Sequence, residues 1–299
     1  MEINPYITDI LNQPDALRMG INGYDAATFN DIVGRLRSGE FDRIVITGMG
    51  ASHYGTYPAW LRLVQQGLPA WHIETGELLH YALPLISERT LLWVVSQSGL
   101  SAEIQAILSS VRRRPPAVIL ATTNDLNSPL AQKADLTLAL NAGQEFTVST
   151  KTYLNTLAVT QLAALQMTGG EIDRARQDLF STADGIQAYL EEWQDRLALW
   201  RDDLAVPERL VILGRGNSLA SAQLAALIQK EAAKFEAEGI SAGQFRHGPL
   251  ELVDQRLAAI IIEGDQVARE MNLGLARDLE KYQARVIWVG KEPVEGISF

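Results

Sequence analysis

The amino-acid sequence predicts an α/β protein that contains doubly wound parallel sheets. Three observations support this fold class. Apolar runs of about five residues, rich in β-branched side chains or leucine, suit strands that are buried on both faces of a parallel sheet. Longer segments with helical spacing alternate with these runs, as they do in βαβ units. The chain has 299 residues, 47% of them hydrophobic, which is enough for one large domain or two smaller ones.

The first half of the chain contains four of these apolar runs. We predict strands at Arg43–Thr47, Leu91–Val95, Ala117–Ala121 and Leu136–Leu140. The spacing predicts helices over Ser101–Arg112 and Thr150–Met167. Because crossovers between parallel strands are right-handed, the functional loops should lie at the carboxyl ends of the strands.

A second series of strands follows a charged helical stretch, Ala175–Asp203, and we place the domain boundary in or near that stretch. The predicted strands are Arg209–Leu213, Leu257–Ile262 and Arg285–Val289. The predicted division is an N-terminal helical segment at residues 1–24, a first domain at 25–172, a helical linker at 173–206 and a second domain at 207–299. We expect the second domain to be shortened at its C-terminal end, because it stops soon after its third predicted strand.

The two halves share a glycine turn after their first predicted strand. The sequences are Gly48-Met49-Gly50-Ala51-Ser52 and Gly214-Arg215-Gly216-Asn217-Ser218, which have the pattern G-x-G-x-S in common. Each turn leads into a segment with helical spacing. The shared context favours an internal duplication.

Composition and charge exclude several classes of function. The chain has 26 basic and 36 acidic side chains, a net charge of −10, which disfavours nucleic acid as a partner. It has no cysteine, so a thiol nucleophile and a thiolate zinc site are excluded. No H-E-x-x-H or other metal-ligand spacing occurs, and we expect no metal. No apolar run approaches a membrane span and no signal peptide precedes the chain, so we expect a cytoplasmic protein without a membrane partner.

The first glycine turn invites a dinucleotide interpretation that the sequence does not favour. The G-x-G-x-x-G fingerprint requires a small residue where His53 stands, although Glu74, at the end of a possible further strand, could bind a ribose. A P-loop is excluded because no G-K-[ST] occurs. Two interpretations stay open, a backbone approach to a ligand with Ser52 at the helix start, and a simple turn with a capping serine.

The loop after the second predicted strand of the first half is more informative. Ser96, Gln97, Ser98 and Ser101 lie within six residues, beside Gly99, at a strand-to-helix junction. A helix N-terminus and uncharged hydroxyl donors can bind a phosphate monoester without lysine or arginine. We favour this interpretation over a capping role for Ser101 in an ordinary polar loop. A further polar loop at 141–151 specifies no chemistry by its spacing.

Two residues of the second half are candidates for acid–base chemistry. Glu231 continues the apolar stripe of a predicted helix, so we expect its carboxylate on a buried face with a raised pKa, unless it forms a structural ion pair. His247 lies in a turn with glycine and proline, beside Arg246, where its side chain can project into a cleft. The other histidines have the settings of packing or surface residues.

The sequence runs SQSGLSAE, NAGQEFTVSTKTY and KEAAKFEAEGISAGQFRHGPLELVD resemble the sugar isomerase (SIS) domain family. They are most similar to the tandem isomerase portion of glutamine–fructose-6-phosphate aminotransferases and to stand-alone phosphosugar isomerases, deaminases and deglycases. The motifs fall in the same order over nearly the whole chain. The resemblance implies two SIS domains, each a three-layer αβα parallel sheet of the flavodoxin or Rossmann type.

The resemblance also implies roles for particular residues. Sugar-phosphate binding falls on the serine-rich loop and, in addition, on Ser52 and Ser149. The proton-shuttling glutamate of the family falls on Glu231, and its ring-opening histidine falls on His247. In relatives this histidine reaches the site of a second subunit, which implies a homodimer whose sites are completed across the interface. No metal or organic cofactor is implied.

Some positions depart from the family pattern. Leu100 stands where glutamate is common, and Ile228 replaces a lysine that precedes the glutamate in the aminotransferases. Within the polar loop, the segment at residues 143–151 is one residue shorter than in the aminotransferases. The glutaminase domain and the C-terminal lysine-bearing tail are missing from this sequence, so we expect no glutamine-dependent amination and no Schiff base from that tail.

The combined prediction is a phosphosugar isomerase or amino-sugar-phosphate deaminase that moves a proton between C1 and C2. The alternative from another class is a non-catalytic sugar-phosphate sensor. The sequence leaves open which sugar phosphate is bound and whether the outcome is isomerisation, deamination or deglycation.

Overall fold

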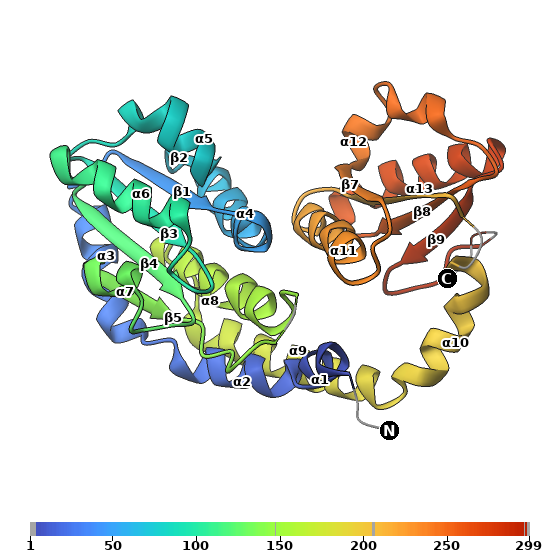
Figure 1. The fold of residues 1–299 in the computed structure, drawn as a ribbon, viewed down its shortest axis with the longest axis horizontal. Coiled ribbons are helices and arrows are strands. Elements are labelled where there is room, and N and C mark those ends of the chain that lie inside the picture. The colour runs from blue at the N-terminus through green and yellow to red at the C-terminus, as the bar shows by residue number, and fades with distance from the viewer. Residues whose placement is uncertain (1–3, 147, 205–206, 296, 298–299) are drawn as a thin grey trace. The chain divides into compact units, whose positions relative to one another are not determined.

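The computed structural model describes residues 4–146, 148–204, 207–295 and 297 of the chain. These residues form two compact units, Met1–Leu190 (unit 1) and Glu191–Phe299 (unit 2). Both units are α/β structures built on a parallel sheet (Figure 1). The predicted fold class is therefore confirmed.

Unit 1 contains a five-stranded sheet in the order β2-β1-β3-β4-β5, and each neighbouring pair is parallel. Its strands are β1 (Arg43–Gly48), β2 (Ala70–Glu74), β3 (Thr90–Val95), β4 (Val118–Thr123) and β5 (Leu136–Ala139). All four strands predicted in this half are present, and so is the possible strand that ends at Glu74. The strands differ from the predicted runs only by one or two residues at their ends.

Helices cover both faces of this sheet, so unit 1 has three layers (Figure 1). The helices of the first half are α1 (Pro5–Leu11), α2 (Gln13–Gly23), α3 (Ala26–Arg37), α4 (Gly50–Gln65), α5 (Thr75–Glu77), η1 (Leu78–Ala82), η2 (Leu83–Leu85), α6 (Ala102–Ser110), η3 (Val111–Arg113), α7 (Pro129–Lys133), α8 (Lys151–Met167) and α9 (Ile172–Glu191). Alternation along the strands sorts the core. Ile44 and Ile46 pack with α3, α4 and α8, whereas Val45 faces the layer that contains α6 and α7.

Unit 2 repeats this arrangement with four strands in the order β7-β6-β8-β9, again all parallel. Its strands are β6 (Arg209–Gly214), β7 (Ala237–Ser241), β8 (Leu257–Ile262) and β9 (Arg285–Val289), and its helices are α10 (Trp193–Leu204), α11 (Ser218–Ala232), α12 (Ala242–Phe245), η4 (Pro249–Leu252) and α13 (Gln266–Lys281). One face of the sheet packs against α11, and the other packs against α12 and α13. The three predicted strands are confirmed, and β7 is an addition to them.

Strand order places the functional edge of each sheet. In the order 2-1-3-4, the first strand of a unit lies between its second and third strands, so successive crossovers leave it in opposite directions. The direction of the crossovers reverses between the first and the third strand, and this place is called the switch point. Open α/β sheets bind ligands in the crevice above the carboxyl ends of the strands at this point. In unit 1 this switch point lies between β1 and β3.

Candidate functional site

The switch point of unit 1 contains a small cavity of about 150 Å³. It is formed where β1 leads into α4 and where β3 leads into the loop at residues 96–101, which we call the serine loop. The residues that line the cavity are Met49, Ser52, Val95, Ser96, Gln97, Ser98, Ser101 and Ile104. The structure therefore brings together five of the six residues predicted to bind substrate, all except Ser149.

Three serine side chains of this loop are arranged so that their protons are free to be donated. The Oγ atom of Ser96 accepts a hydrogen bond from the backbone N–H of Gly99 at 3.1 Å, and that of Ser98 accepts one from Leu100 at 3.3 Å. The Oγ atom of Ser101 accepts from the N–H of Ile104 at 3.4 Å, which caps α6. A hydroxyl that accepts in this way still has its own O–H to donate. The cavity therefore offers several hydroxyl donors to one guest.

The lining of this cavity contains no ionisable side chain. Its donors are hydroxyls and a carboxamide, and the N-terminus of α6 adds a partial positive charge next to them. Such an arrangement suits a compact anion with several acceptor oxygens. It explains how a chain of net charge −10 can offer an anion site without a basic cluster.

Contacts with the loop after β4 fix the shape of the serine loop. Gly99 has a φ angle of +61°, and a Cβ atom at this position would lie 2.2 Å from the Oγ atom of the buried Ser128. The carbonyl oxygen of Gln97 accepts hydrogen bonds from the backbone N–H of Asn124 at 3.0 Å and from the Oγ atom of Thr123 at 3.1 Å. The donors of the serine loop are therefore held in place before any ligand arrives.

The polar loop, residues 141–146 and 148–151, is anchored through charged groups. The carboxylate of Glu145 accepts hydrogen bonds from the backbone N–H of Thr150 at 2.7 Å and of Thr152 at 3.2 Å. Lys151 is buried, and its Nζ atom lies 2.8 Å from Oδ1 of the fully buried Asp9 and 2.6 Å from the carbonyl oxygen of Gln144. This ion pair ties the loop to α1.

Ser149 lies in the polar loop and outside the lining of the cavity. Its Oγ atom is 2.9 Å from the Oγ1 atom of Thr152, the residue whose backbone is held by Glu145. The structure does not bring Ser149 into the serine cluster. Its predicted role in substrate binding stays a prediction.

An aromatic cluster joins α4, the helix that carries Ser52, to β2. The rings of His53 and His72 are stacked with their centroids 3.8 Å apart, and Tyr57 and Trp60 lie against His72. The Nε2 atom of His72 is 2.9 Å from the hydroxyl of Thr56. Burial, and then the neighbouring imidazole, lower the pKa of His72 to about 3, and burial also lowers the pKa of His53. Both rings act as neutral packing groups at pH 7.

Glu231 corrects one of our expectations, because its side chain is exposed and not buried. The helix that carries it ends at Ala232, and Lys234 has a φ angle of +55°, so the apolar stripe stops short of Phe235. Only the earlier turns of α11 pack on the sheet, through residues such as Ala222 and Ala226. Within unit 2 the carboxylate of Glu231 is therefore open to solvent.

His247 is also exposed, and its backbone N–H donates to the carbonyl oxygen of Gln244 at 2.9 Å. The sequence neighbours of both candidate acid–base residues line one cavity of unit 2, about 380 Å³ in volume. Lys230 precedes Glu231, while Phe245 and Pro249 flank the turn of His247. Neither Glu231 nor His247 itself lines this cavity, and no hydrogen bond joins their side chains within the described chain.

The switch point of unit 2 contains a different set of groups. Arg215, which occupies the position of Met49 in the shared glycine pattern, donates from Nε to Oδ1 of Asn272 at 3.0 Å. The side chain of Asn272 donates in turn to the carbonyl oxygen of Glu263 at 3.1 Å, and the carboxylate of Glu263 pairs with Arg269. Burial and the nearby Arg246 lower the pKa of Arg215. Internal pairing replaces the free hydroxyls of unit 1.

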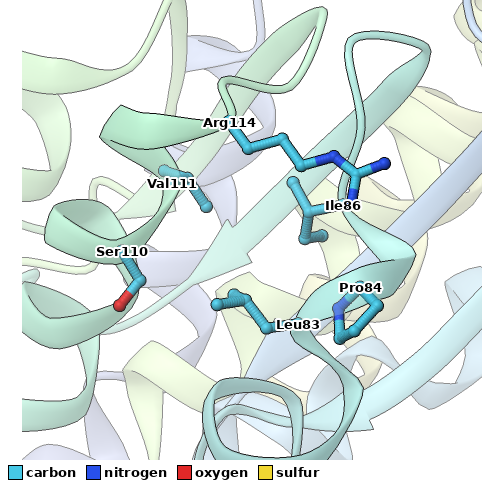
Figure 2. A pocket seen from close by; sticks show the side chains of 6 residues that line it. All are labelled: Leu83, Pro84, Ile86, Ser110, Val111 and Arg114. Atoms are coloured by element: carbon cyan, nitrogen blue, oxygen red, sulfur yellow. The ribbon is translucent and has the colours of Figure 1, made fainter.

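A second cavity of unit 1 has a different character (Figure 2). It has a volume of about 200 Å³ and is lined by residues that precede β3 and β4 in the chain, namely Leu83, Pro84, Ile86, Ser110, Val111 and Arg114. Figure 2 shows the side chain of Arg114 extending past Ile86 over an apolar floor. This cavity lacks the convergent hydroxyls of the switch point.

Comparison with known proteins identifies the family. The model of the SIS domain matches residues 40–166 and 203–295, which together make up most of the chain. The chain belongs to the SIS domain family. Its serine-rich cavity lies within the first matched segment, and Glu231 and His247 lie within the second.

Within the described residues, no helix is both long enough and apolar enough to cross a membrane.

Curated relatives of this SIS protein include aminotransferases. The glutamine–fructose-6-phosphate aminotransferase (isomerizing) of Chlamydia caviae is 29% identical over 302 residues, which cover 98% of this chain and 49% of that protein. The corresponding protein of Chlamydia abortus is 30% identical over 266 residues, which cover 87% of this chain and 44% of that protein. The chain thus spans about half the length of the curated relatives that it matches.

Solved structures share the fold of this SIS protein. The C-terminal domain of glucosamine-fructose-6-phosphate aminotransferase from Francisella tularensis superposes with a TM-score of 0.80 at 22% identity, covering 95% of this chain and 83% of that one. Tagatose-6-phosphate ketose/aldose isomerase from Escherichia coli gives 0.77 at 23% identity, with 96% and 82% coverage. Glucosamine-6-phosphate deaminase from Thermotoga maritima gives 0.76 at 21% identity, with 96% and 85% coverage.

Several groups that shape the site were not predicted from the sequence. Met49 and Ile104 line the cavity as apolar neighbours of the serines. Thr123, Asn124 and Ser128 hold the serine loop from the next loop along. The signal for these three was available, since the polar run after the third predicted strand must lie at the same edge of the sheet.

Proposed function

We propose that this chain binds a sugar phosphate and catalyses proton transfer between C1 and C2 of the sugar, as a phosphosugar isomerase or an amino-sugar-phosphate deaminase. The observation that carries this proposal is the cavity between β1 and β3, where Ser52, Ser96, Ser98 and Ser101 converge without a charged side chain. Its size and its donors suit the phosphate group. Membership of the SIS family and the names of the relatives support a sugar as the rest of the substrate.

Glu231 is the proposed acid–base residue. Its carboxylate would take a proton from C1 of an open-chain ketose, leaving an enediolate, and would return the proton to C2. With an amino aldose the proton would move from C2 to C1 through an enolamine, and water would then hydrolyse the resulting C2 imine and release ammonia. The exposure of Glu231 supports this role, because the side chain is accessible to a substrate carbon. General acid–base transfer of this kind contributes roughly 10²–10⁴-fold in rate.

His247 is proposed to assist opening of the sugar ring, by moving a proton between the ring oxygen and the anomeric hydroxyl. Its position in an exposed turn, between the cavity-lining residues Phe245 and Pro249, supports this role. We further propose that the protein is a homodimer in which His247 serves the site of the partner subunit. Sedimentation equilibrium should then give twice the chain mass of 32.9 kDa.

The proposed reaction is tested by solvent-proton exchange. Fructose 6-phosphate, glucosamine 6-phosphate and tagatose 6-phosphate are incubated with the protein in D₂O, and the C1 and C2 protons are followed by NMR. We expect deuterium to enter C1 or C2 of at least one of them. The Glu231→Gln variant should lower the exchange rate at least ~100-fold while ligand binding persists. Glu236→Gln, which changes an exposed carboxylate five residues away, serves as the matched control.

The outcomes separate the two classes of function. Exchange that survives in Glu231→Gln would refute the role of that residue. Thermal stabilisation by a sugar phosphate with no exchange in the unchanged protein would favour the sensor. Failure of every sugar phosphate and of inorganic phosphate to stabilise the protein would refute the binding site itself.

A further inference from the structure

Asn124 contacts both of the loops that are rich in hydroxyl groups in unit 1. Its backbone N–H donates to the carbonyl oxygen of Gln97 in the serine loop at 3.0 Å. Its side chain reaches the polar loop, where Nδ2 donates to the carbonyl oxygen of Gly143 at 2.8 Å and Oδ1 accepts from the N–H of Ala142 at 2.8 Å. One residue after β4 thus joins the loops that follow β3 and β5.

The side-chain contacts require a carboxamide at this distance from the backbone. The group donates to one peptide unit and accepts from the next, as the edge of a strand would do. Aspartate could accept from Ala142 but would place a charged oxygen against the carbonyl of Gly143. Alanine would lose both contacts. In either variant the backbone bond to Gln97 would remain, so the two halves of the bridge can be separated by experiment.

The segment held by Asn124 needs external support. Asn141 and Gly143 have φ angles of +51° and +69°, so the chain turns twice through the left-handed region around Ala142. Ala142 is buried, whereas Gly143 is exposed. Further along, Glu145 and Lys151 hold the other end of the loop. Asn124 supplies two hydrogen bonds at the first end.

We propose that Asn124 is a positioning residue that fixes the polar loop against the serine loop, so that recognition of the sugar part of the substrate depends on it and recognition of the phosphate does not. The statement about recognition rests on the proposed function, in which the serine loop binds the phosphate. It adds that the polar loop, with Ser149, contacts the sugar. The statement about the position of the loops concerns the protein alone.

The first arm of the test uses the full chain without a ligand. Hydrogen–deuterium exchange of the segment at residues 141–146 is compared in the unchanged protein, in Asn124→Ala and in Asn124→Asp. Loss of the bond from the Ala142 N–H should speed its exchange roughly tenfold in Asn124→Ala. Asn127→Ala is the matched control, because Asn127 lies in the same loop and is exposed. Its side-chain carboxamide makes no hydrogen bond within the described residues. Unchanged exchange in Asn124→Ala overturns the proposal.

The second arm measures the affinities for inorganic phosphate and fructose 6-phosphate by calorimetry. In Asn124→Ala the Kd for phosphate should stay within about twofold, while the Kd for fructose 6-phosphate should rise roughly tenfold. Equal weakening of both ligands, or of neither, overturns the assignment of Asn124 to the sugar side. If the unchanged protein binds neither probe, the proposed function fails, and the loop-fixing role is then decided by the exchange arm alone. In the exchange arm, Asn124→Asp keeps the hydrogen bond from the Ala142 N–H. The exchange rate of this N–H should therefore lie between the rates in the unchanged protein and in Asn124→Ala. Urea unfolding checks that both Asn124 variants are as stable as Asn127→Ala.

Discussion

Acidification should destabilise unit 1 through His72. Its imidazole is stacked on His53 and enclosed by Tyr57 and Trp60, so the folded state holds it in the neutral form. Its pKa is about 3 in the folded chain against 6.5 for an ordinary histidine. The unfolded chain therefore binds more protons between these values, and the stability contributed by His72 is complete above pH 6.5 and is lost as the pH falls toward 3. Between pH 7 and pH 5 the free energy of unfolding should fall by about 2 kcal/mol on this account.

The assay compares urea unfolding of the unchanged protein and of His72→Gln at pH 7 and pH 5. Groups that do not contact His72 contribute equally to both proteins, so the difference between their pH responses reports His72 together with the stacked His53. His80→Gln, which replaces an exposed histidine of the same unit, is the control and should respond as the unchanged protein does. NMR of the histidine Cε1 protons supplies a direct check. The reasoning is refuted if His72→Gln and the unchanged protein lose the same stability, or if His72 titrates above pH 5.

Three further predictions concern the loops of unit 1. Gly99→Ala should abolish stabilisation by inorganic phosphate in a thermal-shift assay, because the new methyl group would meet the hydroxyl of Ser128 at 2.2 Å on a backbone with a φ angle of +61°; undiminished stabilisation would show that the loop can relax. Ser98→Ala should weaken phosphate binding roughly tenfold by calorimetry, since one donor is lost, whereas Ser98→Thr retains the hydroxyl and should bind nearly as well; equal affinities would remove Ser98 from the site. Lys151→Met should lower the free energy of unfolding by about 3–5 kcal/mol, because it leaves the carboxylate of Asp9 buried without its cation; a loss below 1 kcal/mol in urea unfolding would contradict this account.

The strands were predictable where burial on both faces made them continuous apolar runs. The run at Leu91–Val95 is entirely buried within β3. β7 was not predicted, because Ala237–Ser241 is an edge strand with Glu238 and Gly239 in its middle. Neither an apolar run nor a regular alternation of apolar and polar residues marks it. The serines of the cavity were predictable because the loop that holds them is short and follows a strand directly.

Other features depend on contacts that no local pattern contains. The ion pair of Asp9 and Lys151 joins residues far apart in the sequence, and no pattern in the sequence around either residue predicts it. Asn124 acts through backbone atoms of two other loops, whose conformations exist only in the folded chain. The expected burial of Glu231 failed because helical periodicity gives the direction of a side chain but not the point at which the helix ends.

The place of α8 in the sequence has a consequence for synthesis of the protein. This helix follows all five strands of unit 1, yet Val159 and Leu162 belong to the same core as β1, β3 and β4, and the helix packs against α2, α3 and α4. A nascent chain that has reached β5 therefore carries an apolar sheet face that is only partly covered. That face is fully covered only after α8 and the residues Ile172, Ala175 and Leu179 of α9 have left the ribosome. Between the synthesis of β5 and that of α8, the new chain therefore exposes apolar surface that favours aggregation.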